Sequence, residues 1–257
     1  MFNFFKKKSQ LAEETIKEEE KFDNILPIQE YLYKKTGITF ENQESILISK
    51  VKIFCKKHEI YSFETLLSKV RMQRDLDQEL INHITTNETY FYREFKQIEK
   101  LCTLVKEKNN PVSIICAPSA TGEEPYSIAI ALLEANVPAS HINIVGIDIN
   151  SEALEKSKKA LYSKLNVRNL SEDILQKHFT KKNDLYELKE NVKSLVHFEL
   201  RNIFDASFHT IGKFDFVFSR NMLIYFDKET KQKAKEILQA LRKEDTNPVF
   251  FGHADLF

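Results

Sequence analysis

The sequence predicts an α/β protein with a mainly parallel sheet, an inserted small β-subdomain and a preceding all-α domain. Beyond Asn109 the chain carries short apolar runs rich in β-branched and aromatic residues, separated by amphipathic segments. Apolar strands that alternate with helices are typical of a parallel sheet covered on both faces. Before Asn109 the apolar residues recur at helical spacing, and no alternating strand pattern interrupts them. We therefore expect a helical domain followed by a sheet domain.

The N-terminal part divides into a charged segment and the helical domain. Residues 1–24 contain KKK at 6–8 and EEE at 18–20. Segments so rich in charge do not offset the entropy of ordering, so we expect a disordered tail or a solvated helix. Residues 25–86 are predicted to form the helical domain. Its apolar residues recur every three or four positions, as in Leu47, Val51, Phe54, then Leu66, Val70, then Leu76, Leu80, Ile84.

The sheet domain is expected from residue 87 to residue 257. Its predicted strands are VSIIC (112–116), INIVGI (142–147), LVHFEL (195–200), FDFVFS (214–219) and PVFFG (248–252). Helices are predicted between several of them, at Tyr126–Glu134, Ser151–Tyr162 and Asp227–Lys243. The stretch 163–194 is too long and too polar for a simple crossover. We interpret it as an inserted subdomain with a short hairpin around Lys182–Asp184.

Composition excludes several classes of function. With 5 glycines in 257 residues, the chain does not encode a glycine-rich phosphate cradle. Its 38 basic and 38 acidic residues balance, so no global positive field favours nucleic acid. The 3 cysteines lack a CxxC pair, which argues against a zinc site or a disulfide framework and suits a reducing cytoplasm. No apolar run approaches the roughly 20 residues of a membrane span, so we expect no integral membrane segment.

The first segment expected to contact a ligand follows the first strand. Ligands of open parallel sheets bind beyond the carboxyl ends of the strands. Here Gly122 is followed by the acids Glu123 and Glu124. The acids repel phosphate, so this segment suits a cationic cofactor that lacks a pyrophosphate. The alternative is ordinary helix-start chemistry, because Thr121 and Glu124 have the spacing of a capping box.

Asp148 follows the second strand, 26 residues after Gly122 (148 − 122). An acid at this position can accept hydrogen bonds from both ribose hydroxyls of a nucleoside. The alternative is an N-terminal cap for the helix that opens at Ser151. That role is already supplied by Asn150 and Ser151, so the sequence favours a ribose-binding acid.

The third and fourth strands are followed by further polar residues. Asn202 could read an adenine edge, although a lone asparagine after a strand is more often a turn residue. FSRNMLIYFD places Arg220, Asn221 and Tyr225 at the same rim. An arginine and a tyrosine near a cleft can position an anionic substrate, although Tyr225 could also belong to the core.

ITTNETYFYRE (84–94) joins the two domains. It places the polar residues Asn87, Thr89 and Arg93 among aromatic neighbours. The plain interpretation is a helix cap followed by an amphipathic helix start. Each of these features alone is a weak signal.

Their combination is specific. TTNETYFYRE, SATGEEPYSIAI, GIDINSEALEKSKKALY, FSRNMLIYF and FGHADLF, in this order and spacing, resemble the CheR family of chemotaxis protein-glutamate O-methyltransferases. The resemblance extends from about Leu32 to the last residue. It implies a Rossmann-like class I methyltransferase domain that uses S-adenosylmethionine and releases S-adenosylhomocysteine. It also implies glutamates of chemoreceptor cytoplasmic signalling helices as acceptors, and a cytoplasmic enzyme that acts at membrane-bound receptor arrays.

The resemblance also assigns roles to individual positions. Arg93 and Tyr225 are implied near the reacting groups, where we expect them to orient the acceptor carboxylate. Glu124 is implied at the methionine end of the cofactor, Asp148 at the ribose, and Asn202 with Ile203 at the adenine. The full set of implied cofactor contacts is Asn87, Thr89, Arg93, Gly122, Glu124, Asp148, Asn202, Ile203, Arg220 and Asn221. No metal is required, because a glutamate carboxylate is already ionised at pH 7.

Receptor binding is expected to involve the helical domain. Lys50, Lys52, Lys56 and Lys57 form a local basic stretch, and helical spacing puts Lys50 and Lys57 on one face. Our hypothesis is that this face docks the acidic receptor helix. The alternative is an ordinary solvated face with extended lysine stems.

One departure from the family pattern bears on how receptors are recognised. Residues 163–194 contain no glycine, whereas members that dock a receptor's C-terminal pentapeptide carry a glycine-bearing tight turn in this subdomain. We therefore expect an enzyme independent of that pentapeptide. Two other functions stay open: methyl transfer to a different substrate, or a non-catalytic scaffold that senses the cofactor.

Overall fold

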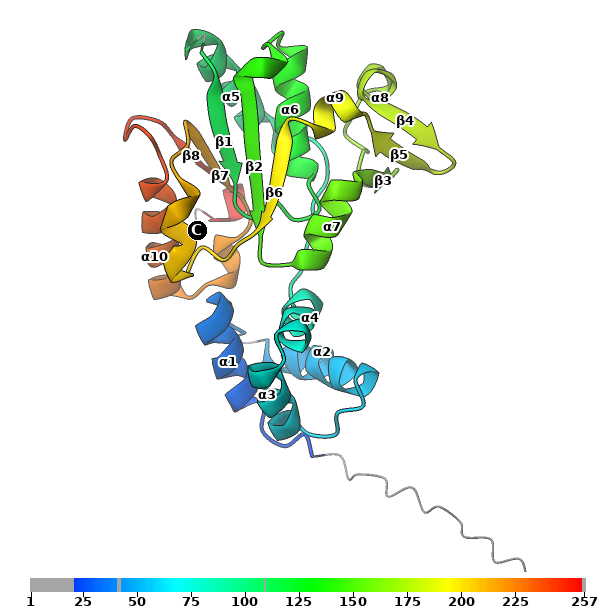
Figure 1. The fold of residues 1–257 in the computed structure, drawn as a ribbon, viewed down its shortest axis with the longest axis vertical. Coiled ribbons are helices and arrows are strands. Elements are labelled where there is room, and N and C mark those ends of the chain that lie inside the picture. The colour runs from blue at the N-terminus through cyan, green and yellow to red at the C-terminus, as the bar shows by residue number, and fades with distance from the viewer. Residues whose placement is uncertain (1–20, 41–42, 109, 256–257) are drawn as a thin grey trace, which may run out of the picture.

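The computed structural model describes residues 21–40, 43–108 and 110–255, so most of the charged segment expected at 1–24 lies outside the described residues. The chain forms a helical domain, and above it in Figure 1 an α/β domain with a small second sheet at its side. Residues 85–94 connect the two domains.

The helical domain contains α1 (Leu26–Thr36), α2 (Glu44–Lys57), α3 (Phe63–Met72) and α4 (Arg74–Ile84). Their apolar faces share one core that includes Leu32, Leu47 and Leu80. Ser62 starts α3, because its hydroxyl accepts a hydrogen bond from the backbone N–H of Thr65 at 3.0 Å.

The main sheet is parallel throughout and has the strand order β6-β2-β1-β7-β8. Its strands are β1 (Val112–Cys116), β2 (Ile142–Asp148), β6 (Val196–Leu200), β7 (Phe216–Ser219) and β8 (Val249–Phe251). The chain runs outward from β1 to β6 and then returns to β7 on the other side, so β1 and β7 flank the point where the strand order reverses. The predicted α/β fold class is confirmed.

Both faces of this sheet are covered. On β1, Ile114 packs in one core with residues of α5 (Phe95–Lys108) and α6 (Glu123–Glu134). The next residue, Ile115, packs in a second core with Leu238 of α10 (Lys228–Ala240). Successive strand residues point to opposite faces, which explains why the strands read as continuous apolar runs rather than alternating ones.

The inserted region builds the second sheet, which is antiparallel and has the order β3-β5-β4. Its elements are β3 (Leu161–Ser163), α8 (Glu172–His178), β4 (Phe179–Lys182), β5 (Leu185–Leu188) and α9 (Glu190–Lys193). The β4–β5 turn contains Asn183 at a left-handed φ of 54°. Asparagine tolerates this conformation, so the tight hairpin forms although residues 163–194 contain no glycine. The expected independence from a receptor pentapeptide therefore does not follow from a missing turn, and it stays a prediction.

Helix boundaries differ from the predictions at three ends, one of which is the end of α10, which lies at Ala240 rather than at Lys243. The helix expected to reach Tyr162 is α7 (Ser151–Lys159), and Ala160 ends it with a left-handed φ of 49°. Tyr162 instead lies in β3, buried with its ring 4.8 Å from that of Phe91. Helix α6 starts at Glu123, one turn earlier than expected. The spacing of apolar residues did not predict the end of α7 or the start of α6, because packing against the rest of the fold sets both.

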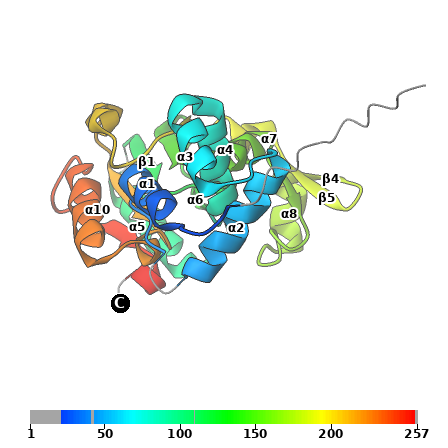
Figure 2. The same cartoon turned by 90° about the horizontal axis from the view of Figure 1, so that it is seen from below.

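The helical domain faces the carboxyl ends of the main strands (Figure 1). Seen from below in Figure 2, α1–α4 spread across the α/β domain. Hydrogen bonds cross between the domains: the Asn202 amide donates to the carbonyl of Lys35 at 2.7 Å, and the Thr39 N–H donates to the carbonyl of Tyr225 at 2.9 Å. Short 3-10 turns complete the fold: η1 (Ala139–His141), η2 (Ala206–Ile211), η3 (Leu223–Tyr225) and η4 (His253–Asp255).

Candidate functional site

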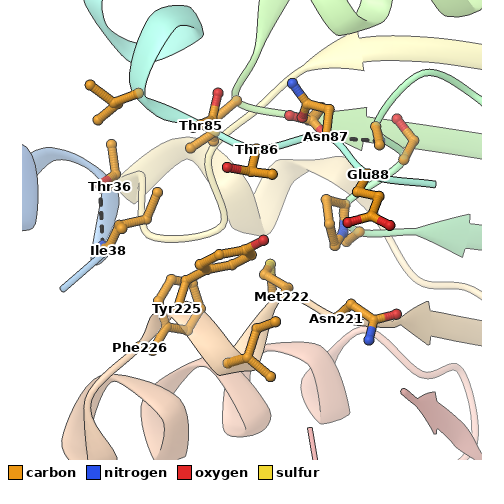
Figure 3. A pocket seen from close by; sticks show the side chains of 18 of the residues that line it. Thr36, Ile38, Thr85, Thr86, Asn87, Glu88, Asn221, Met222, Tyr225 and Phe226 are labelled. Carbon is orange, nitrogen blue, oxygen red and sulfur yellow. Dashed lines mark hydrogen bonds between the residues drawn. The ribbon is translucent and has the colours of Figure 1, made fainter. Parts of the chain in front are cut away.

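A cavity of about 450 Å³ lies between the carboxyl ends of the main strands and the helical domain. This is the usual place for a ligand in an open α/β sheet. Figure 3 shows its wall: Ile38 from the helical domain, Asn87 and Glu88 from the interdomain segment, and Asn221 and Tyr225 from the region after β7. Three separate parts of the chain therefore close around one space.

Glu124 and Arg220 form a buried ion pair in the cavity wall. Glu124 is in the first turn of α6, Arg220 directly follows β7, and Arg220 Nε lies 2.5 Å from Glu124 Oε2. The two residues are 7% and 6% exposed. Burial raises the pKa of the Glu124 carboxyl, and the positive charge of Arg220 opposes that rise.

This pair retains unused hydrogen-bonding capacity. Glu124 Oε1 and Arg220 Nη1 are buried and form no hydrogen bond of good geometry among the described residues, and the weakly donating Cys116 thiol is the other group beside the Glu124 carboxyl. An unpaired buried polar atom costs free energy. A ligand that carries an amino group and a carboxylate would supply partners to both atoms. The pair is therefore suited to the amino-acid end of a cofactor.

Asp148 ends β2 at the cavity and is 5% exposed. Its Oδ2 accepts a hydrogen bond from the backbone N–H of Ala120 at 2.8 Å, and its Oδ1 accepts one from that of Asn150 at 2.8 Å. Burial raises the pKa of the Asp148 carboxyl to about 6, while these hydrogen bonds favour the ionised form. A carboxylate fixed in this way can accept hydrogen bonds from a pair of ribose hydroxyls.

The interdomain segment places Asn87, Thr89 and Arg93 in the cavity wall. Arg93 Nη1 donates to the backbone carbonyl of Glu88 at 3.0 Å, and its guanidinium lies 5.7 Å from the centre of the Tyr90 ring. These contacts orient the arginine while leaving most of its donors available. The helix-cap alternative for this segment is excluded, because α5 starts only at Phe95.

Tyr225 lies on η3 at the same wall (Figure 3). Burial raises the pKa of its hydroxyl, and the charge of Arg93 opposes the rise. The phenol therefore stays protonated at pH 7 and can donate a hydrogen bond. Sequence reasoning left open whether Tyr225 is a core residue, and the structure puts it at the cavity.

Asn221 and Ile203 also line the cavity. Asn221 has a left-handed φ of 60°, and its backbone N–H donates to Asp255 Oδ2 at 2.5 Å. The buried Asp255 carboxylate also accepts from the N–H of Leu223 at 2.8 Å. The FGHAD sequence therefore has a structural purpose, which is to hold the backbone that carries Asn221.

Gly122, which the resemblance implies as a cofactor contact, does not line the cavity. It has a φ of 93°, and a Cβ there would lie 2.7 Å from Ser157 Cβ and 3.0 Å from the Tyr162 hydroxyl. Glycine is thus needed for the turn and for close packing against α7 and β3. The capping box is also absent: the Thr121 hydroxyl donates to Glu123 Oε2 at 2.6 Å, and α6 has no side-chain cap.

Asn202 and Lys50 line the cavity but are occupied by contacts within the protein. The Asn202 amide nitrogen donates to Lys35, and its Oδ1 accepts from the N–H of Phe204 at 2.9 Å, as in an ordinary turn. Lys50 Nζ donates to the carbonyl of Ile84 at 2.8 Å and contacts Thr86 Oγ1 at 3.5 Å, and burial lowers its pKa. Of the two predicted docking lysines, Lys57 is exposed and Lys50 is half-buried.

Sequence reasoning missed the contribution of the helical domain to this cavity. Thr36, Ile38 and Phe40 line it, and so does Glu88 of the interdomain segment. No local pattern marks Ile38 or Phe40 as site residues, because they look like ordinary core positions. Glu88 could have been found, since it stands between Asn87 and Thr89 in the motif.

The part of the chain that the structure describes holds neither a metal-binding cluster nor a membrane-spanning helix. Within the described ranges, no group of three or more His, Cys, Asp or Glu side chains is arranged to hold a metal ion. None of the helices that the structure describes is long and apolar enough to cross a membrane.

Residues 87–257 match the family model described as CheR methyltransferase, SAM binding domain. The chain is similar to a chemotaxis protein methyltransferase of Campylobacter jejuni, with 36% identity over 222 residues that cover 86% of this chain and 84% of the relative. It is also similar to chemotaxis protein methyltransferase 2 of Vibrio cholerae, with 34% identity over 245 residues, or 88% of this chain and 83% of the relative. A chemotaxis protein methyltransferase of Borreliella burgdorferi is 28% identical over 249 residues, or 91% and 88% of the two chains.

Proposed function

This chain belongs to the CheR methyltransferase family, and from this premise we propose that it transfers a methyl group from S-adenosylmethionine to glutamate side chains of chemoreceptors. The products are glutamate methyl esters, which serve chemotaxis adaptation, and S-adenosylhomocysteine. One observation carries the proposal: buried atoms of Glu124 and Arg220 that form no hydrogen bond of good geometry within the described residues line the same cavity as the Asp148 carboxylate.

These residues fit the cofactor in chemical detail. Glu124 Oε1 is available to its amino group and Arg220 Nη1 to its carboxylate. Asp148 would accept hydrogen bonds from the ribose hydroxyls, and Ile203 would pack on the adenine. Asn87 and Thr89 would contact the cofactor from the interdomain segment. The acids of this site disfavour phosphate, which S-adenosylmethionine lacks.

The protein's task in the reaction is to position the acceptor. When bound, S-adenosylmethionine supplies a methyl group on a sulfonium that leaves as a neutral thioether. A glutamate with an ordinary pKa near 4.3 is already an ionised nucleophile at pH 7, so no general base is required. Alignment of the two groups with exclusion of water contributes about 7–11 kcal/mol to such a reaction.

We assign the alignment of the acceptor to Arg93 and Tyr225. The Arg93 guanidinium stays protonated, so it attracts the carboxylate and does not act as a base. Tyr225 lies near enough for the charge of Arg93 to affect its pKa, and that pKa is raised, so its hydroxyl donates a hydrogen bond. Together they would hold one carboxylate oxygen toward the methyl group.

We propose that chemoreceptor cytoplasmic signalling helices dock along α2, which would bring the enzyme to receptor arrays at the membrane. Ile46 and Ile53 are 52% and 59% exposed on this helix. With the exposed Lys57 they form one face at spacings of seven and four residues, and Ile46 also lines the cavity. Lys50 lies on the same face, but its Nζ donates to the carbonyl of Ile84. An amphipathic helix with acidic residues complements such a face in both charge and hydrophobicity. Nucleic acid is a poorer partner, because the 38 basic and 38 acidic residues of the chain balance and give no overall positive field.

A transfer experiment tests this function. Protein is incubated with S-adenosylmethionine labelled in its methyl group and with a receptor cytoplasmic fragment, with or without a C-terminal pentapeptide. We expect base-labile label on glutamate, at equal rates for both fragments. A strong rate increase with the pentapeptide would contradict pentapeptide independence. Label on nucleic acid or a small molecule, or binding without transfer, would favour the alternative functions.

Arg168 offers a matched control for Arg93 in this assay. Its guanidinium lies 3.7 Å from the centre of the Tyr90 ring, but it is exposed and does not line the cavity. We expect Arg93→Met to lose most of the transfer and Arg168→Met to keep it. Equal activity of the two variants would contradict the role of Arg93.

A further inference from the structure

Asn150 connects the Asp148 loop to the helical domain. Its backbone N–H donates to Asp148 Oδ1 at 2.8 Å, and its side-chain Oδ1 accepts from the N–H of Ala153, also at 2.8 Å, as the N-terminal cap of α7. Its amide nitrogen donates to Thr85 Oγ1 at 2.7 Å and to the carbonyl of Asn82 at 3.1 Å. Asn82 lies in the last turn of α4, and Thr85 directly follows that helix. One residue therefore links helix α7, Asp148 and the helical domain.

Asn82 completes this link from the α4 side. Its Oδ1 accepts from the backbone N–H of Ser151 at 2.9 Å, and its amide nitrogen donates to Ser151 Oγ at 2.9 Å. Gln78, one turn earlier on α4, donates to the carbonyl of Ile149 at 2.8 Å and to Asn82 Oδ1 at 2.9 Å. Each of the residues 149–151 is thus hydrogen-bonded to α4.

The capping of α7 does not explain this arrangement. Serine, aspartate and asparagine cap a helix about equally well through the side-chain oxygen alone. In Asn150 the oxygen is the capping atom, and both donors of the amide nitrogen point to the helical domain. Asn150 is 2% exposed, so these donors could not be satisfied by solvent. The amide nitrogen therefore has a second role, which is to connect α7 to the helical domain.

We propose that Asn82 and Asn150 are positioning residues for cofactor binding: through them α4 holds residues 149–151 and so fixes the Asp148 carboxylate at the cavity. This inference rests on the cofactor site proposed above and extends it into the helical domain. That domain thus has two functions, to dock the substrate and to build part of the cofactor site.

Two substitutions test the role of the amides. Asn150→Ser keeps a capping oxygen for α7 but removes both donors to α4. Asn82→Ala removes the bonds to Ser151 from a helical position that alanine suits. We expect each variant to bind S-adenosylmethionine about tenfold more weakly in calorimetry, because each loses two or more of the hydrogen bonds that hold residues 149–151 to the helical domain. At saturating cofactor the turnover number should stay near that of the wild type, because Arg93 and Tyr225 are untouched.

Tyr33→Phe is the matched control. The Tyr33 hydroxyl forms another interdomain hydrogen bond, 3.0 Å from Thr230 Oγ1, away from Asp148. We expect its cofactor affinity to equal that of the wild type. If Tyr33→Phe weakens binding as much as the two asparagine variants, general loosening of the domains is responsible and the positioning role is wrong. Unchanged affinity in both asparagine variants overturns the positioning role alone. A wild-type protein that does not bind S-adenosylmethionine overturns the cofactor site as well.

Discussion

Asp148 shows how the surroundings of one residue set its chemistry. Burial raises its pKa from the ordinary value of the residue to about 6. A raised pKa means that the folded chain binds this proton more tightly than the unfolded chain. The ionised carboxylate therefore lowers the free energy of unfolding as pH rises through the interval from about 4 to 6. A ligand that donates hydrogen bonds to the ionised form recovers part of this free energy.

Cofactor binding should consequently depend on pH. We expect the dissociation constant of S-adenosylmethionine to rise as pH falls below about 6, approaching tenfold per pH unit, because the ligand binds the ionised Asp148. Asp148→Asn should weaken binding at pH 7.5 by roughly 10- to 100-fold, since hydrogen bonds to charged groups contribute about 1.5–3 kcal/mol. Calorimetric titration at several pH values measures both effects.

The same variant identifies the titrating group. Asp148→Asn should lose most of the pH dependence, and the residual slope should come from Glu124, whose pKa is also raised by burial. A variant that binds tightly and keeps the full wild-type profile would show that another group controls binding.

At the scale of elements, two lysines of α2 have different roles: Lys50 makes a hydrogen bond within the protein, and Lys57 is exposed to solvent. Lys57 is exposed at the end of the helix. Lys50 reaches the last turn of α4, where a cation also interacts favourably with the helix dipole. In return, His83 Nε2 of α4 lies 2.9 Å from the carbonyl of Lys50. Of the two lysines expected to dock the receptor, Lys50 is therefore a structural cation and Lys57 is exposed.

Substitution of the two lysines should separate these tasks. Lys57→Glu should raise the Michaelis constant for the receptor several-fold without changing the affinity for S-adenosylmethionine. Lys50→Met should instead weaken cofactor binding, because it releases the segment that carries Asn87 and Thr89. Steady-state kinetics with calorimetry distinguishes the two. An identical effect of both variants on the receptor constant would restore the original hypothesis of a two-lysine docking face.

The inserted subdomain supports the site without lining it. Phe91 of the interdomain segment packs against Tyr162 and Phe179, with ring centres 4.8 and 5.3 Å away. Its backbone N–H donates to the carbonyl of Asn166 at 2.9 Å. The Asn166 amide also donates to Glu123 Oε1 at 2.7 Å. The insertion thus holds both the segment that carries Arg93 and the start of α6 that carries Glu124.

At the scale of the whole molecule, residues of both domains line one cavity. A ligand bound there should therefore stabilise both domains against unfolding. Any ligand that binds only the folded protein stabilises it, by about 2.7 kcal/mol at a hundredfold excess over its dissociation constant. S-adenosylhomocysteine should therefore raise the melting temperature by roughly 5–10 °C for a chain of this size. Both domains should melt in one calorimetric transition.

Adenosine triphosphate is the control ligand for this measurement. It shares the adenosine part but carries phosphates, which the acidic residues Glu124 and Asp148 disfavour. We expect no comparable shift with it. Two transitions of which only one moves with S-adenosylhomocysteine would contradict a site built by both domains.

Much of this molecule could be predicted from local pattern. The five apolar runs lie where β1, β2, β6, β7 and β8 form, because strands buried on both faces must be continuously apolar. Asp148, Arg220 and Glu124 could be named as site residues, because topology brings the carboxyl ends of parallel strands to one edge.

Other features of the structure could not be predicted from local sequence patterns. The end of α7 at Lys159 depends on β3 pairing with β5, some 25 residues later. The positions of Ile38 and Phe40 at the cavity depend on how the helical domain docks. These outcomes are set by contacts between residues far apart in the chain, which periodicity does not record.

The sequence by itself determined the fold class, the family and the acids that suit a phosphate-free cofactor, because strand burial, helix spacing and contiguous motifs are local properties. Only the tertiary structure decided what each polar side chain contacts. It made Gly122 a packing residue, committed Asn202 and Lys50 to internal hydrogen bonds, and joined Asn82 to Asn150 across the domains. The physical reason is that a donor's role depends on which acceptor the folded chain brings within about 3 Å, and that acceptor is rarely near in sequence.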